Sequence, residues 1–485
     1  MRMCLLFLLV LNNAIQGLSQ TPGTISLQEV IAIAQQRSAA YKLAQTQQEV
    51  SYYQFLTYKS NLKPQISLYG SAPVFVKQYT PVIQPDGKVL FLPLKQNTNR
   101  VGFSLSQVLP FTGGSVSLNT ELYQFYDFQA KYNQYNGTPV FLQLNQPLFA
   151  LNTLKWQKKI EPLKLQEAKK NYVQEIENIA QQTAQLYFNV LDAQTNIQIA
   201  NSNMEHDNYN YAIEQKRVNL GTTTEDKLLQ LELQTLKGKQ SLEKANYDFK
   251  MAVLALQTYI GYKDSLHWEF LLPEQVPVFP VQLDRAIAYA RLYRAEFITF
   301  KRRALEATQN LQEAKAARQQ VTLTATYGLN RAAGNIGTIY SDSKAQQTFS
   351  IGINVPIVDW GRTKARYNTA VSLEKLAIFN NEMDSANIVQ EITTLVNNIE
   401  LLKGNIQLAK TTDSVARRRF NISNNLYQAG KLTVTELNIA QSEKDNANRS
   451  YISALRDYWN SYYQLRRQTM FDFQKNIPLP GLTVD

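Results

Sequence analysis

Cysteine is nearly missing from this sequence: Cys4 is the only one among 485 residues. It lies in an apolar run from Cys4 to Leu11 that follows a charged start and precedes a small-residue zone, a pattern typical of a secretory signal peptide. We expect residues 1–20 to be this leader, with cleavage near Gln20. The mature chain would then have no cysteine, which excludes disulfide bonds, thiolate metal sites and a lipid-bearing N-terminal cysteine.

Histidine is almost as scarce, with only His206 and His267 in the chain. Neither has metal-ligand spacing around it, and we expect both on the surface. The sequence also lacks a phosphate-binding glycine loop, a His-Glu-x-x-His motif and a Gly-x-Ser-x-Gly motif. These absences predict a protein that is not an enzyme and that has no cofactor and no metal site.

Long apolar runs are absent too. No stretch after the leader is apolar over the ~20 residues that a membrane-spanning helix needs, so any membrane contact would come through strands closed into a barrel, or through a surface. The formal charge of +11 is spread along the chain, and its densest runs lie in helical patterns, at 301–303 and 417–419. We expect solvated helix faces there and no nucleic-acid partner.

The sequence does contain an internal duplication. Gln146-Pro147-Leu148-Phe149 resembles Val355-Pro356-Ile357-Val358, and the two prolines lie 209 positions apart. The turn at Gly221 resembles the turn at Gly430 with the same offset of 209. The starts of the two halves, near Ile25 and Val281, instead differ by 256, so the first half holds an insertion of about 47 residues.

Apolar residues between these landmarks advance by alternating steps of three and four, the pattern of a coiled coil. We therefore expect very long helices at about 150–218 and 360–428, each ~100 Å long at ~1.5 Å per residue. Pro162 predicts either a kink in the first of them or a later start. A helix of about forty residues should return from each glycine turn, and an uninterrupted helix should open each half, at about 25–62 and 281–319.

Alternating segments predict two strands in each half, at 65–69 and 140–144 and at 321–327 and 348–355. The insertion, about 73–126, has further alternating pieces and is either a second hairpin or a side decoration. The predicted organisation is a leader (1–20), a first repeat (21–262), a Pro-rich linker (263–280), a second repeat (281–473) and a tail (474–485). Four strands cannot close a membrane barrel alone, whereas three chains would supply twelve.

The strand-to-helix entries at 146–149 and 355–361, and the turns at 220–226 and 427–433, resemble those of the TolC family of outer-membrane factors, over nearly all of the mature chain. The resemblance implies a mainly α fold with a small β part: a long antiparallel coiled-coil helical barrel plus a transmembrane β-barrel shared by three protomers. It implies a homotrimer in the cell outer membrane that extends into the periplasm. It also implies contact with outer-membrane lipid, a periplasmic adaptor (membrane fusion protein) and an inner-membrane pump.

The same resemblance places a periplasmic gate, or an adaptor-docking site, at the two turns. The candidate residues are Gly221, Thr222, Asp226, Tyr427, Gly430 and Glu436. The family's basic residue two positions after the second glycine is replaced here by Leu432, and Asp226 lies one position nearer its glycine than in the family. An ordinary aromatic contact remains an alternative for Tyr427, and a solvated helix start remains one for Glu436 and Asp226.

The leading hypothesis for function is the outer-membrane exit duct of a tripartite efflux or type I secretion system, which conducts substrates passively. The alternative is a periplasmic coiled-coil adaptor or structural rod without a pore, which would lack paired strands at equivalent places in both halves. The sequence does not identify the exported substrate.

Overall fold

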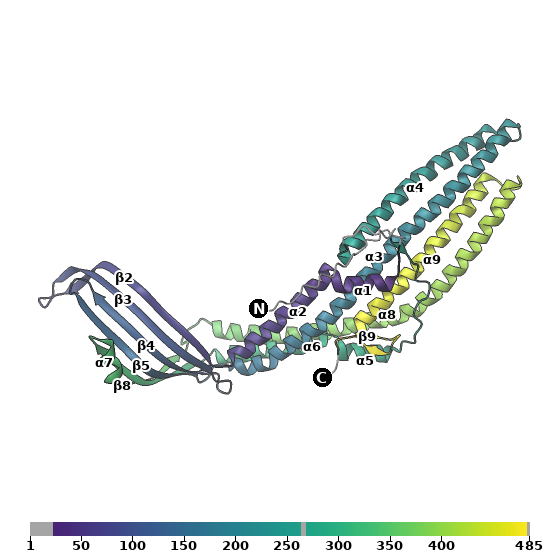
Figure 1. Ribbon diagram of the computed structural model, residues 1–485. Helices are drawn as coiled ribbons and strands as arrows, with labels where there is room; N and C mark the ends of the chain where they lie inside the picture. The colour runs from purple at the N-terminus through teal and green to yellow at the C-terminus, as the bar shows by residue number, and fades with distance from the viewer. Residues whose placement is uncertain (1–22, 263–267, 483–485) are drawn as a thin grey trace, which may run out of the picture.

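The computed structural model describes residues 23–262 and 268–482 (Figure 1). The predicted leader and His267 lie outside these residues. One end of the molecule is a β-sheet and the rest consists of long helices that run away from it (Figure 1). Within the described residues, no helix combines the length and the hydropathy needed to cross a membrane.

The two longest helices are α3 (Thr153–Asn219) and α8 (Arg362–Gln428), with 67 residues each. The returning helices are α4 (Glu225–Ile260) and α9 (Val434–Thr469), with 36 residues each. The first and last residues of α8 and α9 lie 209 positions after those of α3 and α4. The predicted long helices and returning helices are confirmed. Helix α3 runs through Pro162 as one element, so the later start is excluded.

The predicted heptad positions form the core between these helices. In α3 the buried members include Ile179, Val190 and Ala193, and in α8 they are Ile388, Ile392, Leu395, Ile399, Leu402 and Ile406. Most of them pack in one apolar cluster with the aromatic end of α9, where Tyr458 and Trp459 are buried, whereas Ile388 and Ile392 pack in a separate cluster with Ala286 and Ala290. The alternation of three and four therefore identified the faces that pack.

The opening helix of each half is broken, which corrects the expectation of uninterrupted helices. Ser38 separates α1 (Leu27–Arg37) from α2 (Ala39–Asn61), because its backbone is extended and its side chain caps the second helix. A second break, at Arg294, separates α5 (Leu283–Tyr293) from α6 (Glu296–Ala316). Neither break contains proline or glycine, so the sequence offered only the serine as a weak capping signal.

The sheet has six antiparallel strands in the order β2-β3-β4-β5-β7-β8. The first half supplies β2 (Gln65–Ile83), β3 (Val89–Val108), β4 (Ser115–Asp127) and β5 (Tyr132–Pro147). The second half supplies β7 (Gln320–Ala333) and β8 (Lys344–Asn354), which a short helix α7 (Ile336–Ser341) connects. The expectation of four strands per chain is wrong, because the insertion makes an extra hairpin in the same sheet and is not a side decoration.

Small pairings fix the remaining segments. Strand β1 (Thr24–Ile25) pairs in parallel with β6 (Glu269–Phe270), which lies in the predicted linker, and β9 (Phe471–Asp472) pairs with β10 (Ile477–Pro478). The predicted fold class, mainly α with a small β part, is confirmed.

Candidate functional site

The two glycine turns lie at the end of the molecule farthest from the sheet (Figure 1). Gly221 has a φ of +70° and Gly430 a φ of +75°, the left-handed region that glycine adopts without steric cost. Each ends a long helix and lets the chain reverse into the returning helix, as a helix C-terminus commonly does. The amide of Thr222 donates to the carbonyl of Arg217 at 2.9 Å, and its hydroxyl donates to the same oxygen at 3.0 Å.

Tyr427 lies one turn before Gly430 and reaches across to α3. It is 2% exposed, and its hydroxyl donates to Oε2 of Glu214 at 3.1 Å. Glu214, also 2% exposed, accepts two further bonds, from Thr223 at 2.5 Å and from Arg217 at 3.2 Å. One carboxylate thus joins both turns.

Arg217 completes this cluster. Its guanidinium donates to the carbonyl oxygens of Tyr427 at 3.4 Å and Gln428 at 3.0 Å, the last carbonyls of α8. It also lies over the Tyr427 ring, 5.6 Å from the centroid. A cation at a helix C-terminus is favourable because the unpaired carbonyls carry partial negative charge. We call Glu214, Arg217, Thr223 and Tyr427 the tip cluster.

The protonation states follow from these contacts. Burial alone would raise the pKa of Glu214, but the hydrogen bonds from Thr223, Tyr427 and Arg217 outweigh it and hold the pKa below its usual range. Burial, together with the Glu214 carboxylate, raises the pKa of Tyr427 to about 12. At neutral pH the pair is therefore a neutral phenol that donates to a charged carboxylate.

Asp226 and Glu436 lie elsewhere. Glu436 accepts from the amide of Thr433 at 2.9 Å and from its hydroxyl at 2.7 Å, which closes a capping box at the start of α9. These bonds lower the pKa of Glu436. Asp226 is exposed in the first turn of α4, where a carboxylate favours the helix. Within the described residues neither belongs to the tip cluster.

Sequence reasoning missed Glu214, Arg217 and Thr223. A signal was present, because the core positions of α3 become polar towards the turn: Asp207, Asn210 and Glu214 are all buried. A charged residue at a coiled-coil core position is costly unless it is paired, so it marks a place where a partner must exist.

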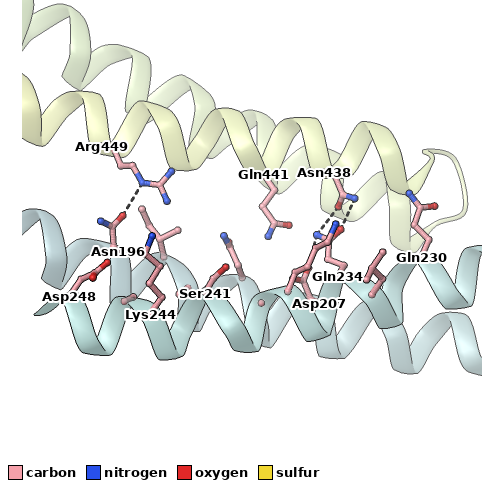
Figure 2. A pocket seen from close by; sticks show the side chains of 17 residues that line it. Asn196, Asp207, Gln230, Gln234, Ser241, Lys244, Asp248, Asn438, Gln441 and Arg449 are labelled. Atoms are coloured by element: carbon pink, nitrogen blue, oxygen red, sulfur yellow. Dashed lines mark hydrogen bonds between the residues drawn. The ribbon is translucent and has the colours of Figure 1, made fainter.

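A polar groove about 730 Å³ in volume lies between α3, α4 and α9, on the side of the tip cluster that faces the sheet (Figure 2). Asp207 accepts from Gln234 at 3.2 Å, and Gln234 exchanges amide bonds with Asn438 at 3.0 and 2.7 Å. Burial is the main cause that raises the pKa of Asp207 to about 6, and the nearby Asp445 adds to it. Near the tips, the contacts between α3, α4 and α9 are therefore made largely by amides and carboxylates.

His206 lies beside this layer and is half-buried with its ring against Phe420, 5.3 Å between centroids, so the expectation of a surface residue is met only in part. The expectation of solvated cations at 301–303 was also partly wrong, because Arg302 pairs with Glu167 at 2.6 Å and Arg303 with Asp384 at 2.9 Å. The described residues contain no group of three or more potential metal ligands.

Solved structures that share this fold include outer membrane channels. The chain is similar to the CmeC outer membrane channel of Campylobacter jejuni, with 16% identity and a TM-score of 0.66 over 94% of this chain and 86% of that one. It is similar to the outer membrane protein VceC of Vibrio cholerae, with 15% identity and a TM-score of 0.63 over 91% of this chain and 95% of that one. It is also similar to the open state of the MtrE outer membrane channel of Neisseria gonorrhoeae, with 16% identity and a TM-score of 0.64 over 92% of this chain and 89% of that one. No curated protein matches the chain by sequence.

A six-stranded sheet joined to two pairs of long helices, α3 with α4 and α8 with α9 (the two arms), is the fold that this chain shares with these outer-membrane proteins. The family model for outer membrane efflux proteins matches residues 106–262 and 300–469. The chain belongs to the outer membrane efflux protein family. Its predicted place in the outer membrane and its predicted role as an efflux channel are thereby confirmed.

Proposed function

We propose that three copies of this chain form one exit duct, to which a periplasmic adaptor and an inner-membrane pump deliver substrates. The observation that carries the proposal is the sheet's two open edges, β2 and β8. An open edge leaves backbone donors and acceptors unpaired, which a bilayer does not tolerate. The six strands alternate in direction, so β8 of one copy and β2 of the next are antiparallel, as closure requires. Three copies supply eighteen strands, not twelve.

The helices support the same arrangement. In α8, Leu401, Leu408, Val415 and Ile422 recur every seven residues and are 55–67% exposed. On α4, a second exposed apolar series includes Leu229, Leu233, Leu236 and Leu254. Helices α3 and α9 lie between α4 and α8, so the two series are on opposite flanks of the chain (Figure 1). Such seams stabilise a coiled coil when a partner covers them, and the proposed partner is the neighbouring copy.

We further propose that the chain consists of two repeats, residues 21–262 and 281–473.

We also propose that the tip cluster, together with the turn residues 221–226 and 427–436, is a latch that holds the duct closed. The bonds of Glu214 to both turns support this latch. Opening would separate the tips, and the free energy would come from partner binding, because a ligand shifts a two-state equilibrium by its differential affinity.

Cross-linking tests the assembly. Leu236 on α4 and Val415 on α8 each lie fifteen residues from their turn glycine, so they meet at one height between neighbouring copies. The double variant Leu236→Cys, Val415→Cys should oxidise to a covalent trimer that conducts ions in a planar bilayer. The single variants are the controls and should give no trimer. A monomeric product without conductance would support the rod alternative.

A further inference from the structure

Four large apolar side chains are exposed at the end of the sheet that meets the helices, three of them almost fully. Phe111 is 98% exposed in the β3–β4 turn, and Phe149 is 60% exposed between β5 and α3. Ile357 and Trp360, between β8 and α8, are 95% and 96% exposed. The strand register places these three loops at the same end of the sheet. Val108 pairs with Ser115, Ser115 with Asn145, and Gln320 with Asn354. We call these four residues the apolar rim.

The loops of the rim are held in place. The side-chain amide of Asn152 donates to the carbonyls of Pro110 at 2.8 Å and Phe111 at 3.2 Å, which ties the first two loops together. In the third, the carboxylate of Asp359 accepts from the amides of Gly361 at 3.0 Å and Thr363 at 2.8 Å. Trp360 has a φ of +53°, unfavourable for a residue with a side chain. The fold thus presents an indole outward at a conformational cost.

A band of positive charge lies next to the rim on the helical side. It consists of exposed cations in the first two turns of α3 and α8: Lys155, Lys158, Lys159, Arg362, Lys364 and Arg366. Neither first turn contains an acidic residue. Cations at a helix start oppose the helix dipole, so helix stability does not account for them. We call these six residues the basic collar.

We propose that the apolar rim and the basic collar together form a binding surface for anionic phospholipids at the edge of the bilayer where the strands become helices. The inference rests on the proposed function, since it needs the sheet to lie in the membrane. Aromatic rings favour the headgroup level, and long basic side chains extend from the apolar region towards phosphate groups. An apolar band bordered by the basic collar fits an anionic lipid surface better than it fits water or a neutral lipid, and it would fix the depth of the duct in the bilayer.

The test uses the mature chain reconstituted in vesicles of phosphatidylcholine and phosphatidylglycerol, with one lipid brominated near the glycerol end of its acyl chains. The signal is the fluorescence lost on quenching, taken as the difference between the parent chain and Trp360→Phe. At equal mole fraction, brominated phosphatidylglycerol should quench Trp360 at least about twofold more than brominated phosphatidylcholine. High salt should remove the difference, because exposed charges are screened.

The collar is tested by changing its six residues to glutamine, which should abolish the preference for phosphatidylglycerol. The matched control changes six exposed lysines near the other end of the helices, Lys216, Lys227, Lys237, Lys239, Lys244 and Lys250, and should keep it. Equal quenching by both lipids, or a preference that survives loss of the collar, would overturn the inference. So would a conducting channel whose Trp360 neither lipid quenches, which would put a neighbouring copy over the rim. A chain that neither conducts nor shows lipid quenching would overturn the proposed function as well.

Discussion

The hydroxyl of Tyr427 donates to the carboxylate of Glu214 at 3.1 Å, so a residue at the end of α8 is bonded to one near the end of α3, 213 positions away in the chain. Both side chains are buried. The bond connects the tips of the two arms, and the predictions below begin with it.

Tyr427→Phe removes this bond and keeps the ring. A hydrogen bond to a charged group contributes about 1.5–3 kcal/mol, and Glu214 keeps its bonds to Thr223 and Arg217. We expect the free energy that holds the tips together to fall by about 1–2 kcal/mol. In a planar bilayer the variant should be open for a larger fraction of the time. Tyr209→Phe, at a 55% exposed position on α3, is the control; equal open fractions in both variants would argue against a latch.

Asp207→Asn should stabilise the protein at neutral pH. The folded-state pKa, about 6, is above that of the unfolded chain. The favourable contribution of protonated Asp207 is therefore complete below about pH 4 and is lost as the pH rises through about 6. The variant should gain about 1–3 kcal/mol at pH 7 and little at pH 4. Thermal unfolding across this range measures the gain, and Asp248→Asn, an exposed site on the same groove, should show no such pH dependence.

Arg466→Met should strongly destabilise the middle of the molecule. The guanidinium of Arg466 bonds to both oxygens of Glu177, at 3.0 and 2.8 Å, and to Asp472 at 3.0 Å, and both carboxylates are buried. Removing the cation leaves them unpaired, a loss of about 3–5 kcal/mol. The apparent Tm should fall, and the tail after Met470 should become sensitive to protease. Lys403→Met removes an exposed pair with Glu400 at 3.8 Å and should cost less than about 1 kcal/mol.

Two glycine-to-alanine substitutions should change the free energy of unfolding in opposite directions. Gly430→Ala places a side chain at a φ of +75° and should cost about 1–2 kcal/mol. Gly404→Ala lies inside α8 with no atom within 4 Å of the added carbon, so it should gain about 0.5–1 kcal/mol. Thermal unfolding of the two variants separates backbone strain from crowding. A loss in both would mean that the α8 face at Gly404 is covered by another chain.

The helical part of the fold could be predicted closely, because heptads and turn glycines are local signals that determine both the length and the packing face of a helix. Helices α3 and α8 therefore begin and end near their expected bounds. Strands β2 and β3 were missed over most of their length, because Lys77, Pro81 and Pro93 interrupt their alternation. A sheet with solvent or lipid on its faces has no core to enforce a clean pattern.

For the site, the sequence revealed what one turn contains but not what meets across two arms. Tyr427 was found through the family resemblance at its position three residues before Gly430, whereas its partner Glu214 lies in the other half of the chain. Only the pairing of α3 with α9 and of α9 with α8 brings these positions together. Long-range pairs of this kind leave no mark on spacing.

The identical length of α3 and α8 has a consequence for how such a protein can change its size. The long helix of each arm has 67 residues and is followed by a glycine turn. The tip cluster forms only if α3 and α8 end at the same height. A wider or narrower cell envelope would therefore demand the same insertion or deletion in both arms, in whole heptads. A change in one arm alone would separate Tyr427 from Glu214 by ~10 Å per heptad.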